Sequence, residues 1–251
     1  MNMSALRMEW LKGRRRRLWL APLLILAAQL AWGFFNFKNM QPAELSQGWA
    51  GILYTFPLLN AMMMPILAAV TASRLIDVEH KGQTFKLLET LQRTETLYDA
   101  KFICAALYIL LMIVLQIILM LVFGVLRGFA GPIPWDQVAL YALSTVLVTL
   151  TILLMQFILA LLIANQLVGM IVGLIGAFAG LFALFFPTAL QKTILWAYYG
   201  VLSSTAMDWD RETRIVDYYF VPYAWESFIF LALVFAALYL IGRRAFVKKE
   251  V

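Results

Sequence analysis

Side chains that commonly catalyse reactions or bind metal ions are scarce in this sequence. His80 is the single histidine and Cys104 the single cysteine, which excludes an internal disulfide and the common zinc sites. The chain contains neither the G-x-x-x-x-G-K-[ST] loop that cradles ATP phosphates nor the G-x-S-x-G turn of serine hydrolases. We therefore predict no catalytic residue, no metal site and no cofactor bound by this chain, and we expect His80 to be a solvated loop residue.

Amide side chains within strongly apolar runs are the next candidates for a function, and they are Gln29, Asn60, Gln116 and Gln156. In a membrane they can hydrogen-bond between helices, at modest energy, or some of them can line a substrate path. An intramembrane enzyme would need a charged or catalytic pair at the same depth. Asp99, next to Tyr98, lies outside the apolar runs and has no partner aspartate within them, which disfavours an enzyme.

The composition is that of an integral membrane protein. Hydrophobic residues make up 63% and charged residues 14% of the chain, and the mean hydropathy is +0.84, whereas soluble domains have roughly 25% charged residues. Six apolar runs can each cross a core of about 30 Å as a helix: Leu18–Phe35, Gly51–Ser73, Phe102–Leu126, Val138–Ala164, Leu167–Phe186 and Tyr223–Gly242. Backbone groups in lipid must be hydrogen-bonded within their own segment, so we predict a single all-α transmembrane domain over residues 1–251.

Basic residues predict the orientation of the spans. Residues 4–16 are basic and amphipathic, with Leu6, Trp10 and Leu11 on one side, and we expect them to lie along the membrane surface as an interfacial helix. With the N-terminus inside, the Lys and Arg residues that fall outside are only Lys38, Arg127, Lys192, Arg211 and Arg214, of 20 in total. The positive-inside rule thus predicts both termini in the cytoplasm, and it explains the net charge of +6 without a nucleic-acid partner.

Small residues mark the fifth span, where Gly169, Gly173, Gly176 and Gly180 recur every three or four residues. Such small-residue pairs let two helices approach closely. We expect them to pack against the fourth or the sixth span. A seam between two copies of the chain is the alternative.

The inner connecting segment, Arg74–Lys101, has nearly balanced charge, which suits a protein partner. Within it, Phe85, Leu88 and Leu91 recur at three-residue spacing and predict a short helix with an apolar edge. This edge either packs on the flanking spans or docks a cytoplasmic protein.

Three polar or small residues border this short helix. We expect Gly82 to supply the turn before it, since glycine adopts a positive φ without steric cost. Glu79 and Lys101 stand at the ends of the flanking spans, where they are better placed to set the posture of the loop than to contact a nucleotide.

The outer connecting segment, Pro187–Pro222, is amphipathic in its first half. Leu195, Trp196, Tyr198 and Tyr199 predict an apolar helix that re-enters the outer leaflet as a gate, with its aromatic rings facing the membrane or the axis of a dimer. The alternative is that these rings are ordinary interfacial anchors. An exposed acidic stretch follows, from Asp208 to Asp217.

The sequence patterns around several of these residues also resemble those of a known family. The start Glu9-x-Leu11-Lys12, followed by basic residues and the first span, resembles the start of ABC-2 type transporter permeases. The inner segment resembles the same family at Glu79, Gly82, Lys86, Leu88, Tyr98, Ala100 and Lys101. Spacing and placement are similar to the branch that contains bacteriocin (lantibiotic) immunity permeases.

The resemblance implies a membrane subunit that works as a dimer, with a second copy or a sister permease, and with separate ABC ATPase subunits that hold ATP and Mg²⁺. It places a coupling helix at Gln83–Gln92 and an outer re-entrant element within Pro187–Thr205. The coupling residues would then be Glu79, Gly82, Phe85, Lys86, Leu88, Leu91 and Lys101. We expect an exporter of an amphipathic peptide in a bacterial cytoplasmic membrane; a drug or lipid exporter, or the membrane anchor of a signalling complex, are the alternatives.

Overall fold

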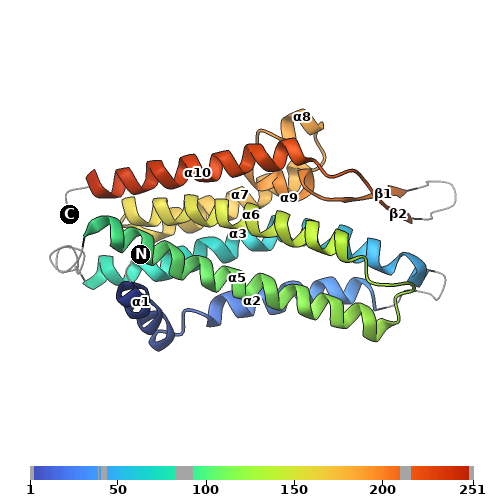
Figure 1. The fold of residues 1–251 in the computed structure, drawn as a ribbon, viewed down its shortest axis with the longest axis horizontal. Coiled ribbons are helices and arrows are strands. Elements are labelled where there is room, and N and C mark those ends of the chain that lie inside the picture. Colours follow the sequence, from blue (N-terminus) through green and yellow to red (C-terminus); the bar gives the residue numbers. More distant parts are fainter. Residues whose placement is uncertain (1–2, 39, 41–43, 83–92, 210–215, 249–251) are drawn as a thin grey trace.

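The computed structural model describes residues 3–38, 40, 44–82, 93–209 and 216–248, which form an elongated bundle of long helices (Figure 1). Its helices are α1 (Met3–Arg15), α2 (Leu20–Asn36), α3 (Gly48–Gly82), α5 (Thr94–Arg127), α6 (Trp135–Leu162), α7 (Gln166–Ala183), α8 (Thr188–Gln191), α9 (Tyr198–Val201) and α10 (Trp225–Lys248). Two 3-10 turns, η1 (Glu44–Gln47) and η2 (Leu195–Ala197), and two strands, β1 (Thr205–Trp209) and β2 (Val216–Phe220), complete the described chain. The prediction of an all-α membrane protein is confirmed, apart from the small hairpin.

Among the described residues, 5 helices are long and apolar enough to cross a membrane, namely α3 with η1, α5, α6, α7 and α10. The chain between Ala5 and Asn36 passes the same test only as a bent pair, in which α1 and α2 meet at 68°. This bend separates the basic N-terminal helix from the first span, as expected for a helix that lies along the membrane surface. The predicted spans therefore correspond one by one to α2, α3, α5, α6, α7 and α10.

Helices α3 and α5 continue well past the apolar runs that predicted them. Helix α3 runs on from Ser73 to Gly82, and α5 begins at Thr94, before its apolar run opens at Phe102. Ion pairs support these extensions; Lys81 Nζ lies 2.7 Å from the Asp77 carboxylate one turn earlier. The two helices thus form stems that project beyond the apolar part of the bundle.

Helix α3 is the central element, since it contacts α2, α5, α6, α7, α9 and both strands. It contains Pro57 and Pro65. A proline has no N–H for the carbonyl four residues earlier, so the carbonyls of Leu53 and Ala61 receive no helical hydrogen bond from these positions. This central helix is the predicted second span.

The glycine face of α7 brings that helix close to α3 and to η2. A Cβ added at Gly173 would lie 2.6 Å from Cβ of Ala69 on α3, and Cβ atoms at Gly176 and Gly180 would collide with Trp196. Close packing within the chain is therefore confirmed. The predicted contact with the fourth span is present at Gln156 of α6, which lies 3.2 Å from a Cβ at Gly173, but it is not the largest contact of α7. The main partners are α3 and the outer connection.

Strands β1 and β2 form an antiparallel hairpin in the stretch that was predicted only as exposed and acidic. Their register sets Asp208 opposite Asp217 and Met207 opposite Tyr218. Gln47 fastens the hairpin to the start of α3, because its Nε2 donates to Asp217 Oδ1 at 2.7 Å and its Oε1 accepts from the Tyr218 N–H at 2.8 Å. Tyr218 also packs on Tyr54 of α3, with 5.5 Å between the ring centroids.

Both chain ends lie at one end of the bundle, together with α1, the last turn of α3 and the first turn of α5 (Figure 1). The hairpin and α8 lie at the opposite end. This arrangement agrees with an even number of crossings. Which end faces the cytoplasm stays a prediction from the basic residues.

Candidate functional site

The two stems meet α1 in a cluster of charges that we call the charged ring, made of Glu9, Lys12, Glu79 and Lys101. Helix α1 supplies Glu9 and Lys12, one turn apart, while Glu79 lies in the last turns of α3 and Lys101 in the second turn of α5. Charges from three helices that are remote in the sequence, by as much as 92 positions between Glu9 and Lys101, therefore come together.

Small residues let α1 approach α5 closely enough for this. Ala5 is buried, and a Cβ at Gly13 would lie 2.7 Å from the Tyr108 hydroxyl. Trp10 stacks on Tyr108 with 4.8 Å between the ring centroids. Glu9 lies on the same buried face, between Ala5 and Gly13. The buried face of α1 is therefore not the predicted apolar edge, because Leu11 on that edge is exposed.

Each charge of the ring contacts two charges of opposite sign. Lys101 Nζ donates to Glu9 Oε2 and to Glu79 Oε1, both at 2.9 Å. Lys12 Nζ donates to Glu9 Oε1 and to Glu79 Oε1, both at 3.1 Å. The result is a closed square with alternating signs and no net charge.

Burial makes this pairing obligatory. Lys101 is 0% exposed, and Glu9 and Glu79 are each 2% exposed. A buried ion loses its hydration, and only close partners of opposite charge offset that loss. Burial alone would lower the pKa of Lys12, but the Glu9 and Glu79 carboxylates outweigh it and raise that pKa above its ordinary value. Lys12 is therefore protonated at neutral pH, and the ring is complete.

Further contacts fix the two stems to the remaining helices. Arg243 of α10 donates to Asp99 Oδ1 at 3.2 Å and to Glu95 Oε2 at 3.1 Å, and the Tyr239 hydroxyl donates to Asp99 Oδ1 at 2.7 Å. These bonds hold the first turns of α5 against α10.

His80 fixes the other stem. Its Nε2 lies 2.9 Å from the Ala160 carbonyl of α6. The prediction that His80 is a solvated loop residue was therefore wrong, because α3 continues past it and turns its ring toward α6. Sequence periodicity in the apolar run ends at Ser73 and gave no sign of this extension.

The predicted coupling residues fall into two groups. Glu79 and Lys101 belong to the charged ring, whereas Phe85, Lys86, Leu88 and Leu91 lie outside the described residues, as does the expected helix over 83–92. Gly82 is the last residue of α3. The expected positive φ at Gly82 is not found, since the described glycines with positive φ are Gly128 and Gly131. The role of these residues in coupling stays a prediction.

Three of the four amides predicted within the spans lie in one buried hydrogen-bond network. Gln29 and Gln116 donate to Asn60 Oδ1 at 2.6 and 2.9 Å. Asn60 Nδ2 donates to the Tyr141 hydroxyl at 2.9 Å, and that hydroxyl donates to Gln116 Oε1 at 2.9 Å. Thr145 accepts a further bond from Asn60 at 3.3 Å. The network thus joins α2, α3, α5 and α6.

Gln156 lies apart from this network, at the contact of α6 with α7. With its amide oriented to satisfy both atoms, it donates to the Gly169 carbonyl at 2.9 Å and accepts from the Gly173 N–H at 3.1 Å. The interhelical hydrogen bonds expected for all four amides are therefore present. Whether any of them also lines a substrate path stays a prediction.

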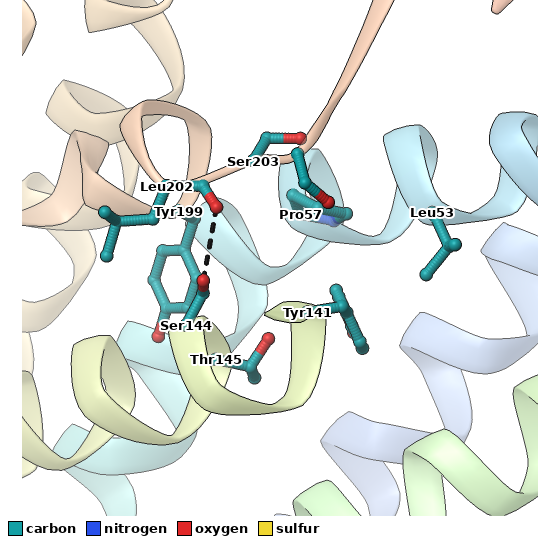
Figure 2. A pocket seen from close by; sticks show the side chains of 9 residues that line it. Leu53, Pro57, Tyr141, Ser144, Thr145, Tyr199, Leu202 and Ser203 are labelled. Carbon is teal, nitrogen blue, oxygen red and sulfur yellow. Dashed lines mark hydrogen bonds between the residues drawn. The ribbon is translucent and has the colours of Figure 1, made fainter. Parts of the chain in front are cut away.

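A small cavity borders the network at Tyr141 and Thr145 and lies between α3, α6 and the outer connection (Figure 2). It is lined by Leu53, Pro57, Tyr141, Ser144, Thr145, Tyr199, Leu202, Ser203 and Ser204. Ser144 Oγ donates to the Leu202 carbonyl at 3.2 Å and shares a hydrogen bond of 2.6 Å with the Tyr223 hydroxyl. The space suffices for about one water, so the cavity is a packed joint rather than a channel.

The outer residues predicted as a gate do not form one helix. Leu195 and Trp196 belong to η2, and Tyr198 and Tyr199 to α9. Tyr198 is 3% and Tyr199 2% exposed, and the Tyr199 hydroxyl lies 2.9 Å from Thr149 Oγ1 of α6. Trp196 lies against Gly176 of α7. The expectation that these rings face the membrane or a dimer axis was wrong, because each packs into the bundle. A role of the segment in gating stays a prediction.

Sequence reasoning missed several members of these clusters. Glu9 and Lys12 were noted only for their resemblance to a family, although a lone acid in a strongly basic stretch already suggests a specific partner. Tyr141, Ser144 and Thr145 were not singled out either. Their spacing places three hydroxyl groups on one face of the fourth span, which is the signal that could have found them.

The charged ring and the polar network both lie in the part of the chain that matches a known protein family. The model of the family described as ABC-2 family transporter protein matches residues 5–180. No curated protein matches the chain. The matched residues include α1, α2, α3, α5 and α6, whereas the outer connection after Phe186 and α10 lie beyond the match.

Proposed function

Because the chain belongs to the ABC-2 family of transporter proteins, we propose that it is the permease of an exporter whose ATP is hydrolysed by separate subunits bound at residues 83–92. In this proposal ATP and Mg²⁺ bind the partner ATPase, and this chain supplies no catalytic group. The family makes the chain a transmembrane component of an ABC transporter. The identity of the ATPase, the substrate and the direction of transport are parts of the proposal.

The charged ring is the observation that supports this mechanism best. The segment 83–92 is joined to the end of α3 on one side and to the start of α5 on the other, so a partner that binds it acts first on these two stems. Glu79 and Lys101 pair directly at 2.9 Å, so the stems move together. Glu9 and Lys12 add α1 to the same unit. A displacement of the segment is thus passed to three helices at once.

Because the stems belong to long helices, a displacement at the ring can reach the opposite end of the bundle. Helices α3 and α5 have 35 and 34 residues, and each is continuous from the ring to the opposite end of the bundle. Rigid helices that slide or rotate as units are a common means of switching between two states. In our proposal, closure of the ATPase subunits moves the stems and changes which side of the membrane the substrate site faces.

We further propose that the substrate is an amphipathic peptide, as in bacteriocin immunity, and that it passes between two permeases rather than through one. Interior polar groups of a single chain are largely used in its own hydrogen bonds. A groove beside Tyr54 and Met207 offers about 270 Å³, which is below the range of about 300–1,000 Å³ usual for small-molecule sites. A homodimer or a pairing with a sister permease provides the larger path. If the substrate were a drug or a lipid, the ATPase would move the stems in the same way.

The test separates docking from coupling. Leu88→Asp, within the segment 83–92, should abolish co-purification of an ATPase in detergent, because a buried apolar anchor contributes roughly 1.5–3 kcal/mol. Lys12→Ala removes the half-exposed member of the ring, and the three buried members stay. This variant should still co-purify with the ATPase but should export less substrate per ATP hydrolysed. ATP hydrolysis and export are measured on the same proteoliposomes.

Arg7→Ala, on the exposed face of α1, is the matched control and should behave as the unmodified protein. Wild-type association and export in the Leu88→Asp protein would exclude 83–92 as the docking segment. Wild-type export per ATP in the Lys12→Ala protein would exclude the ring from coupling. A screen of peptide, drug and lipid substrates with the unmodified complex decides the substrate class.

A further inference from the structure

A groove lies where α10 leaves the apolar part of the bundle beside the first turns of α5. Its volume is about 250 Å³, and it is lined by Glu95, Leu240, Arg243, Arg244, Val247 and Lys248. It is separate from the charged ring and from the polar network. Figure 1 places this end of α10 at the same end of the bundle as α1.

The basic residues of the groove have different surroundings. Arg243 is held by Glu95 and Asp99 at 3.1 and 3.2 Å, so these two carboxylates more than balance its charge, and it forms part of the wall. Arg244 and Lys248 are exposed and lie four residues apart on one face of α10. Across the described ranges, neither of them takes part in an ion pair. Within the described part of the chain, the groove therefore presents two cationic side chains that form no ion pair, beside a Glu95 that is paired with Arg243.

Apolar side chains border these cations. Leu240, one turn before Arg244, is 54% exposed, and Val247 is 45% exposed. The apolar run of α10 ends at Gly242, so Leu240 lies at hydrocarbon depth and Lys248 two turns further along lies beyond it. An apolar surface that continues into a pair of cations is complementary to an anionic lipid, whose acyl chains adjoin a phosphate.

We propose that this groove binds the phosphate of an anionic phospholipid through Arg244 and Lys248, with Leu240 and Val247 against the upper part of an acyl chain. The bound phosphate lies beside the Arg243–Glu95 pair. That pair fixes the first turn of α5, the helix that follows the segment 83–92. Lipid occupancy therefore stabilises the joint between α5 and α10. The proposal does not depend on the substrate or on the partner ATPase.

The experiment uses the full-length permease, purified and delipidated in a neutral detergent. Phosphatidylglycerol or phosphatidylcholine is titrated in, and the melting temperature and the lipid retained in native mass spectra are measured. Phosphatidylglycerol should raise the melting temperature in a saturable way and be retained, whereas phosphatidylcholine should do neither. The R244Q/K248Q protein should bind phosphatidylglycerol roughly 30-fold more weakly, given the typical contribution of each basic residue.

The matched control is R14Q/R15Q, which removes two exposed charges from the last turns of α1 at the same end of the bundle. It should keep the wild-type affinity. Equal weakening in both double variants would overturn the proposal in favour of diffuse attraction. Equal effects of the two lipids, or the same stabilisation by inorganic phosphate at equal concentration, would overturn it too. If the R244Q/K248Q protein has a lower melting temperature without lipid, the single variant Lys248→Gln is compared with the unmodified protein instead. Its affinity for phosphatidylglycerol should be roughly five-fold lower.

Discussion

A lysine enclosed by protein is stable only if its partners replace the water it has lost. Lys101 meets this condition with two carboxylates at 2.9 Å, one from α1 and one from α3. Replacing a whole buried ion pair with well-packed apolar residues is often neutral, whereas removing one partner leaves an uncompensated charge. The main effect of the charged ring is thus to specify which three helices meet. Its contribution to the net free energy of unfolding is small.

At this scale, Lys101→Ala should destabilise the protein by about 3–5 kcal/mol, because Glu9 and Glu79 keep their burial but lose the cation that lies between them. Lys81→Ala is the control, since the Lys81 side chain is 79% exposed and, among the described residues, forms an ion pair with Asp77 alone; a surface pair of this kind contributes less than about 1 kcal/mol. Denaturant or thermal unfolding in one detergent compares the two. Equal losses of stability would show that the ring is not a buried ionic cluster.

Among the elements, α7 depends most on the absence of side chains. A Cβ at Gly176 would collide with the indole atoms Cε2 and Nε1 of Trp196, whereas the nearest atom to a Cβ at Gly169 is Oε1 of Gln156 at 3.6 Å, an ordinary contact. The two glycines lie on the same helix, seven positions apart, and differ only in what faces them. They form a natural pair for measuring how tightly η2 packs on α7.

Gly176→Ala should therefore cost about 1–3 kcal/mol, because the added methyl group displaces Trp196. Gly169→Ala should be neutral or stabilising by up to about 1 kcal/mol, since alanine is the better helix former. Thermal unfolding and the fluorescence of the tryptophans measure both effects. A Gly176→Ala protein as stable as the Gly169→Ala protein would mean that Trp196 does not lie on α7.

The elements also show which parts of the fold the sequence can predict. Each predicted span coincides with the apolar part of one helix, because long apolar runs in a membrane can only be helices. The stems were missed, since Asp77 and Lys81 look like loop residues until they are paired. The hairpin was missed because the stretch was interpreted by the charge of Asp208 and Asp217. The strand-forming residues Tyr218 and Phe220 were not considered. The pairing of Glu9 with Lys101 could not be predicted, because residues so far apart in the sequence form no periodic pattern.

For the whole molecule, the placement of both termini, α1 and the two stems at one end gives a single functional face. The basic residues predict that this face is cytoplasmic. The last turns of α10 and the groove beside them belong to the same face, so the groove lies at the same end of the bundle as the stems.

Cysteine labelling in intact cells tests this orientation. Cys104 is buried, so the native thiol contributes little background. Met207→Cys, on the exposed hairpin, should react with a membrane-impermeant thiol reagent, whereas Lys81→Cys should react only after the cells are permeabilised. Both positions are exposed, at 40% for the Met207 residue and 79% for the Lys81 side chain. The opposite pattern would invert the topology.

The burial of Lys101 also gives the charged ring a chemical signature. An amine reagent needs a neutral, accessible ε-amino group, and Lys101 is fully enclosed with its ammonium bonded to two carboxylates. Lys12, with a side chain 36% exposed, opens onto solvent from the same square. In our proposal the ring moves as one unit, so Lys101 should stay unmodified while the protein transports, and its modification would mean that α1 separates from the stems. The reactivity of this one lysine thereby reports whether the contact between α1 and the stems opens during transport.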